Sequence, residues 1–150
     1  MDNKSNQKAQ MATMIKFTPG DCEAAIELYK RAFGATVEVF MRFADAGEQE
    51  VVKTEEDKQL IYHARLDFEG QRYLLCDNLF DDLPRGHSLY LVATYLAKDG
   101  VIKSYEYMKE GATIISPLHV TDFADYSEAG YALIDRFGIQ WEVFVYNYDA

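Results

Sequence analysis

The segment YKRAFGATV at residues 29–37 decides the fold, because residues 107–114 repeat it as YMKEGATI. In both copies a helical pattern ends at a glycine, which can adopt the left-handed conformation of a helix C-cap. Ala-Thr and a β-branched residue then open a strand. A second pair of segments, FEGQ at 68–71 and FGIQ at 137–140, lies at corresponding turns. The sequence therefore predicts an internal duplication.

The first half contains one predicted helix and four predicted strands. Apolar residues recur at helical spacing over residues 22–33, with Thr18 or Asp21 as the expected N-cap and Gly34 as the stop signal. The predicted strands cover residues 15–17, 37–43, 60–68 and 71–76, and Glu69-Gly70 is a tight hairpin signal. The order is β-α-β-β-β, and we expect the acidic residues 44–59 to form a solvated segment.

The second half repeats this order. A strand at residues 88–96 precedes a helix that Asp99 is expected to cap and that Gly111 ends. A strand opening at residues 113–115 is expected to break at Pro117, with a loop running to about residue 128. Strands at 130–134 and 140–146 then form a hairpin.

The duplication predicts an α+β fold. Each βαβββ unit, about residues 14–80 and 87–147, has too little sheet to bury a core alone. Pairing the units gives eight mixed, mostly antiparallel strands in an open cup with the helices outside. We expect a flexible tail at residues 1–13, a single domain at 14–150, and a small ligand in the cup.

The composition excludes two classes of partner. The formal net charge is −10 at pH 7 without a basic patch, so we expect neither nucleic acid nor an anionic membrane as partner. No apolar run approaches the ~20 residues that span a bilayer, and the opening MDNKSNQKAQMATM lacks the apolar core of a signal peptide. Cys22 and Cys76 have neither zinc spacing nor a secreted context. We expect two inert buried thiols in a cytoplasmic protein.

Three segments together resemble the vicinal oxygen chelate superfamily, which includes glyoxalase, bleomycin-resistance and extradiol dioxygenase proteins. These segments are FTPGDCEAAIELYKRAFGA (17–35), YHARLDFEGQRYLLCDN (62–78) and LIDRFGIQWEV (133–143). Within the superfamily the chain is most similar to the PhnB-like branch, over roughly residues 14–147. The resemblance implies a cup-shaped, glyoxalase/dihydroxybiphenyl dioxygenase-like fold and a homodimer.

The resemblance also implies where a metal would bind. Metal-dependent members hold one divalent ion with four side chains, one each on the first and last strand of both units. At those positions this chain has apolar residues 14 and 15, the leucines of YLLCD (73–77), and His87 just before a strand. Only Glu142 matches, so we predict no cofactor and an incomplete metal site. If a divalent metal is bound, its ligands would be Glu142, His63 and His87.

Strand alternation selects the candidate catalytic residues, Glu142 and His63. In the last strand, Trp141 and Val143 share the face expected to pack on a helix, which turns Glu142 towards the cup. A glutamate partly desolvated among aromatic residues suits proton transfer at neutral pH. The alternatives are that Glu142 pairs with a cation such as Arg65 or is simply hydrated.

The same alternation turns His63 and Arg65 towards the cup, where an anionic or hydrogen-bonding ligand would suit them. A structural His63, hydrogen-bonded to a neighbouring strand, is the alternative, and His119 is expected in a loop. The candidate ligand-binding residues are Arg65, Phe40, Tyr73, Tyr90, Gln140 and Phe144.

We therefore expect a protein that binds a small molecule in the cup. A metal-dependent lyase, isomerase or dioxygenase is the first alternative, and a dimeric interaction module without ligand chemistry is the second. Whether the protein is an enzyme stays open. A methyltransferase activity, ascribed to some PhnB-like proteins, is not expected, since none of the nine glycines forms a G-x-G pair.

Overall fold

The computed structural model describes residues 8–80, 82–84, 86, 88–122 and 127–146. The elements in chain order are β1 (Thr13–Phe17), α1 (Asp21–Phe33), β2 (Thr36–Arg42), the 3₁₀ turn η2 (Phe43–Asp45), α2 (Glu55–Gln59), β3 (Ile61–Phe68), β4 (Gln71–Asp77), β5 (Leu91–Tyr95), α3 (Lys98–Met108), β6 (Thr113–Asp122), β7 (Ser127–Ile134) and β8 (Gln140–Val145). Apart from η2 and α2, this is a βαβββ unit followed by a second one. In the part of the chain that is described, no helix is long and apolar enough to cross a membrane.

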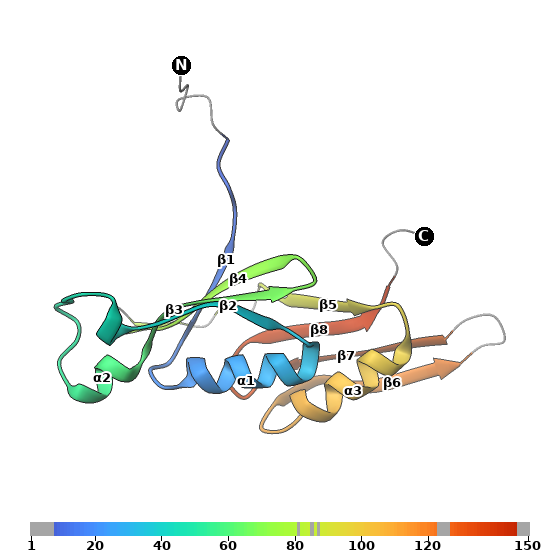
Figure 1. Cartoon of the computed structure of the whole chain (residues 1–150). Helices are drawn as coiled ribbons and strands as arrows, with labels where there is room; N and C mark the ends of the chain where they lie inside the picture. The colour runs from blue at the N-terminus through green and yellow to red at the C-terminus, as the bar shows by residue number, and fades with distance from the viewer. Residues whose placement is uncertain (1–7, 81, 85, 87, 123–126, 147–150) are drawn as a thin grey trace, which may run out of the picture.

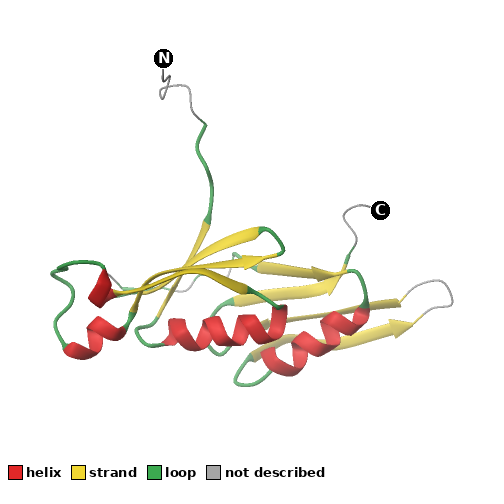
Figure 2. Cartoon of the chain, viewed as in Figure 1, coloured by secondary structure: helices red, strands yellow, loops and turns green. Residues whose placement is uncertain are grey.

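The predicted α+β fold with open sheets is confirmed. Its strands form two four-stranded sheets, β1-β4-β3-β2 and β5-β8-β7-β6, rather than one continuous sheet. In each sheet the first strand of the unit pairs parallel with the last, and the remaining pairs are antiparallel. The helices α1 and α3 pack against each other (Figure 1). Figure 2 shows these two long helices next to each other, with the first sheet above α1 in this view.

One hydrophobic core spans both units. Ile26 and Tyr29 of α1 and Val101 and Met108 of α3 are buried in it, together with the helix-facing residues of both sheets. The helix-facing residues are Ile15, Phe17, Ala64, Leu66, Leu75, Ala129, Tyr131, Leu133, Trp141 and Val143. Each sheet therefore has one face against its helix and one face that its helix leaves free, which we call the free face.

The helix α1 ends as predicted but begins differently. Gly34 follows its last residue with a φ of 71°, the left-handed conformation that glycine adopts at little cost. The predicted cap by Thr18 or Asp21 is wrong, because no neighbouring side chain caps the helix. Asp77, at the end of β4, accepts hydrogen bonds from the Gly20 and Cys22 amides at 2.9 and 3.1 Å.

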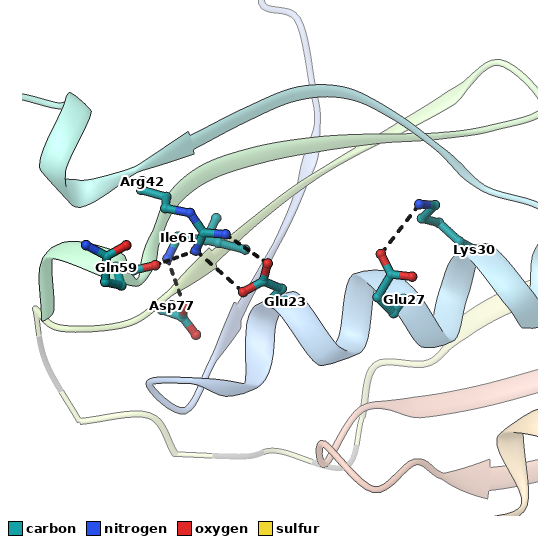
Figure 3. A network of polar contacts seen from close by, with 7 residues as sticks. All are labelled: Glu23, Glu27, Lys30, Arg42, Gln59, Ile61 and Asp77. Carbon is teal, nitrogen blue, oxygen red and sulfur yellow. Dashed lines mark hydrogen bonds and ion pairs between the residues drawn. The ribbon is translucent and has the colours of Figure 1, made fainter. Parts of the chain in front are cut away.

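Asp77 also fixes the start of β3. Its second oxygen, Oδ2, accepts from the Ile61 amide at 2.9 Å (Figure 3). Nearby, Arg42 at the end of β2 donates to Glu23 of α1 at 2.8 Å and to the Gln59 carbonyl. Since Asp77 is only 1% exposed, its carboxylate depends on these amides in place of water.

Three local predictions for the second half need correction. The strand β6 runs through Pro117 to Asp122 instead of breaking there, because it is an edge strand with register shifts on either side of Ser116. The strand β5 is shorter than expected. Asp99 lies within the first turn of α3 and makes no cap, and the N-cap position is Ala97.

A buried carboxylate joins the two units. Asp135, which is 3% exposed, follows β7, and its Oδ2 accepts from the Tyr29 hydroxyl of α1 at 2.6 Å and from Trp141 Nε1 at 3.0 Å. Its Oδ1 accepts from the Phe137 and Ile139 amides at 2.9 and 3.0 Å. The carboxylate thus holds the β7–β8 turn and one helix of the other unit together.

Candidate functional site

Glu142 lies on the free face of the second sheet. Its neighbours in β8, Trp141 and Val143, are buried against the helix side, so the predicted alternation is confirmed. In register it is flanked by Val92 of β5 and Ala132 of β7. The expected desolvation among aromatic residues is wrong, because Glu142 is exposed. Its carboxylate has no hydrogen bond or ion pair with any residue of the described ranges.

His63 and Arg65 lie on the free face of the first sheet. They alternate along β3 with Ala64 and Leu66, which are fully buried on the helix side, as predicted. Both are half-buried. This face of the first sheet therefore presents an imidazole and a guanidinium from a single strand.

Arg65 has an acidic partner within its own sheet. Glu38 Oε2 lies 2.7 Å from Arg65 Nε and 3.3 Å from Arg72 Nε. The interaction with Arg65 is a charge contact only, because the buried Nε–H is not aligned on any hydrogen-bond acceptor of the described chain. The carboxylate beside Arg65 is that of Glu38, so the alternative in which Arg65 pairs with Glu142 is wrong.

The candidate residues are divided between the two units. His63 and Arg65 belong to the first sheet and Glu142 to the second, and the contacts between the units run chiefly through α1 and α3. His87, the third ligand of the hypothetical metal site, lies outside the described residues. Among those that are described, no group of three or more His, Cys, Asp or Glu side chains is arranged to hold a metal ion.

Two of the aromatic candidates lie on the helix-facing side of the first sheet. Phe40 pairs in register with Ala64, and Tyr73 pairs with Leu66. For Phe40 the reason is a β-bulge at Glu38, which shifts the alternation of β2. The ring of Tyr73 packs edge-on against Phe68, with centroids 5.1 Å apart. Neither residue shares the face of His63 and Arg65.

The remaining candidates lie along the second sheet. Phe144 is half-buried on the free face with Glu142, and Tyr90 precedes β5 and is partly exposed. Gln140 is buried, and its side-chain amide donates to the Leu89 and Gly86 carbonyls at 2.9 and 3.3 Å. Gln140 therefore holds the segment that precedes β5 against β8.

The second sheet also contains a histidine that sequence reasoning placed in a loop. His119 is in β6 opposite Gly130, on the free face. A Cβ at Gly130 would lie 3.2 Å from His119 Cε1, so the imidazole packs over the bare backbone of β7. In the sequence, the only indication of this contact is Gly130, an isolated glycine within a strand pattern.

Both thiols are buried, as predicted. Cys22 lies in α1, and Cys76 lies in β4 opposite Lys16 of β1. Burial raises the pKa of Cys22 well above its ordinary value, and the charge of Asp77 adds to this. Burial also raises the pKa of Cys76, against the opposing effect of Lys16. A protonated, inaccessible thiol is a poor nucleophile.

Cavities also open elsewhere among the described residues. One, of about 560 Å³, lies between α1 and α3 and is lined by charged residues that include Arg31, Lys103 and Arg136. Another, of about 350 Å³, lies between β1 and the start of β8 and is mainly apolar. Neither is lined by His63, Arg65 or Glu142.

Solved structures share this architecture. A PhnB protein from Bacillus cereus, named provisionally as a 3-demethylubiquinone-9 3-methyltransferase, superposes with a TM-score of 0.72 at 17% identity, over 92% of this chain and 100% of that one. The chain therefore has a PhnB-like fold. Protein PA1353 from Pseudomonas aeruginosa gives a TM-score of 0.72 at 24% identity, over 92% of this chain and 98% of that one.

More distant structures agree with this fold. Protein SA1046 from S. aureus gives a TM-score of 0.59 at 13% identity, over 92% of this chain and 97% of that one. No protein-family model matches the sequence, and no curated protein matches it. At these identities, the solved structures show the PhnB-like fold alone.

Proposed function

We propose that this PhnB-like protein binds a small molecule on the free faces of its sheets, as glyoxalase and bleomycin-resistance proteins do in the cup that the sequence resemblance implies. The observation that carries the proposal is the placement of His63, Arg65 and Glu142. All three stand on sheet faces opposite the helices, where polar side chains are not needed for the core. Polar groups set among apolar ones are typical of ligand sites.

Exposed apolar side chains on the same two faces also support the proposal. Met14 and Val92 are 48% and 45% exposed, on the free faces of the first and second sheets respectively. Met41 lies beside His63, and Phe144 lies beside Glu142 in its strand. Large apolar side chains that are exposed on a protein surface are typical of sites that bind a ligand or another protein.

A second copy of the chain would complete the cup. The free face of the first sheet carries Arg65, and that of the second carries Glu142. In a two-fold symmetric dimer, the first sheet of one chain can face the second sheet of the other, and this contact then occurs twice. Opposite charges would meet across each of the two cups, with the ligand between them.

A thermal-shift screen of small polar and aromatic compounds tests the proposal. A specific ligand at 100 times its Kd adds about 2.7 kcal/mol to the free energy of unfolding. We expect Arg65→Ala and Glu142→Ala to abolish the shift while each variant stays folded, because Glu38 keeps Arg72 as its partner. The control is Arg31→Ala, which removes a cation from the cavity between the helices.

Two results would contradict the proposal. If no compound stabilises the protein, the chain is better described as a dimeric interaction module. If a compound stabilises the protein and both variants equally, the ligand binds elsewhere. Light scattering on the same samples gives the oligomeric state, which we expect to be a dimer.

A further inference from the structure

The cavity of about 350 Å³ lies at the junction of the two units. Its walls come from Met14, Ile15 and Lys16 of β1, Leu91 of β5, and the turn that leads into β8. The strands β1 and β5 are each at the edge of their own sheet. The cavity therefore sits where the two sheets end; it shares Met14 with the proposed ligand site, but none of His63, Arg65 and Glu142 lines it.

One wall of the cavity is held in place by a buried side chain. Leu83, Pro84, Gly86 and Leu89 belong to the connection between β4 and β5. Gln140 is 6% exposed, and its amide nitrogen donates to the carbonyls of Leu89 and Gly86. If these acceptors were lost, the buried side-chain amide of Gln140 would be unpaired. The two hydrogen bonds therefore hold this wall of the cavity in position.

The described residues that line the cavity are apolar or glycine apart from Lys16 and Gln140. Its apolar side chains are those of Met14, Ile15, Leu83, Pro84, Leu89, Leu91 and Ile139. Among the described residues that line the cavity, Lys16 is the only ionisable one. It is half-buried, and it makes no ion pair or hydrogen bond to any residue within the described ranges.

Among the lysines of the described ranges, Lys16 alone is half-buried without a carboxylate partner, because Lys8, Lys53, Lys103 and Lys109 also lack an ion pair but are exposed. Acidic residues number 25 against 15 basic ones, and Lys30, Lys58 and Lys98 each pair with a carboxylate. A half-buried cation without an anion loses hydration and gains nothing in return. An anionic ligand would supply the missing partner.

We propose that this cavity binds a small monocarboxylate with an apolar body, and that Lys16 pairs with its carboxylate. The volume equals that of roughly twelve water molecules at about 30 Å³ each. A medium-chain fatty acid or an aryl carboxylate has about that number of non-hydrogen atoms. The apolar chain lies against Leu83, Leu91 and Ile139, and the charged end lies at Lys16.

Calorimetric titration with octanoate tests this proposal, with 1-octanol as the neutral probe of the same length. We expect saturable octanoate binding that Lys16→Met weakens at least tenfold and Lys16→Arg restores. Methionine keeps the length and apolar character of the lysine stem and removes only the charge. Binding of 1-octanol should change less than twofold in Lys16→Met.

The matched control is Lys103→Met, which changes the net charge equally but lines the other cavity. Equal weakening by both variants would overturn the proposal, because it would reveal a general electrostatic effect. Unchanged octanoate binding in Lys16→Met, tighter binding of 1-octanol than of octanoate, or no octanoate binding would overturn it as well. Arg65→Ala and Glu142→Ala should leave octanoate binding unchanged, so failure of this proposal and failure of the proposed function can be distinguished.

Discussion

The replacement Asp135→Ala should destabilise the protein strongly, because one buried carboxylate satisfies four donors. Two of these donors, the Tyr29 hydroxyl and Trp141 Nε1, belong to fully or nearly fully buried side chains. The other two, the amides of Phe137 and Ile139, belong to the half-buried turn before β8. Alanine removes all four acceptor contacts and puts no polar atom in their place.

The expected loss follows from the burial of each donor. An unpaired buried donor costs about 1–3 kcal/mol, and the turn amides can recover part of this from water. Tyr29 and Trp141 then account for most of an expected loss of about 3–4 kcal/mol in the free energy of unfolding. Asp135→Asn keeps one oxygen for the turn amides, so about half of that loss is expected.

Urea unfolding followed by tryptophan fluorescence measures both changes, since Trp141 is the only tryptophan and bonds to Asp135 directly. The control is Glu142→Ala, which removes an exposed carboxylate and should change the free energy of unfolding by no more than about 0.5 kcal/mol. A loss of less than about 1 kcal/mol in Asp135→Ala would refute the reasoning, because the carboxylate would then not join the two units.

Three further predictions concern packing, ionisation and metal content. Gly100→Ala should lower the free energy of unfolding by about 1–2 kcal/mol, since a Cβ would lie 2.1 Å from Tyr95 Cδ1 and this strain exceeds the helix-propensity gain of alanine. Gly86→Ala, which meets nothing within 4 Å, is the matched control in the same denaturation assay, and equal behaviour of the two would contradict the argument. Because burial raises the pKa of Cys22 and Cys76, their contribution to stability is complete below about pH 8.5 and falls as pH rises above it, by at most about 1.4 kcal/mol per pH unit for each thiol. Unfolding curves at pH 8 and pH 10 should show this loss in the wild type and a smaller one in Cys22→Val, and an identical loss in both would be evidence against it. Elemental analysis of the purified protein should find less than one equivalent of any transition metal, whereas a stoichiometric metal lost in Glu142→Ala would favour the metal-dependent alternative.

Local patterns were sufficient to predict most of the elements. The spacing of Cys22, Ile26 and Tyr29 identifies α1 because these residues fall on one helical face, and Gly34 ends it by its own conformational freedom. The alternation in β3 and β8 likewise predicts which residues face the helix, since Leu66 and Val143 must be buried. These features depend on residues a few positions apart.

Long-range contacts were not predictable in the same way. Asp77 accepts from an amide of the first turn of α1 that lies 55 residues earlier, and Asp135 accepts from a hydroxyl 106 residues away. Nothing near either residue distinguishes it from a solvated aspartate. The bulge at Glu38, which turns Phe40 to the helix side, also depends on pairing with β3 rather than on the sequence of β2 itself.

The site was predictable as two halves and not as a whole. Alternation places His63 and Arg65 on one free face and Glu142 on another. How the units are arranged depends on the packing of α1 against α3 and on the burial of Tyr29 beside Trp141, whose rings lie 5.2 Å apart. The cation Lys16 was overlooked because its significance comes from the cavity, which no pattern in β1 reveals.

Mixing two variants that each fail to bind the ligand tests most directly whether the free faces of two chains form one binding site. Arg65→Ala and Glu142→Ala would each be refolded alone and together in equal amounts, and ligand binding would be titrated. If each cup takes Arg65 from one chain and Glu142 from the other, half of the dimers are mixed and one of their two cups is intact. The account predicts recovery of about a quarter of the wild-type sites. No recovery in the mixture, with full binding by the wild type, would contradict it.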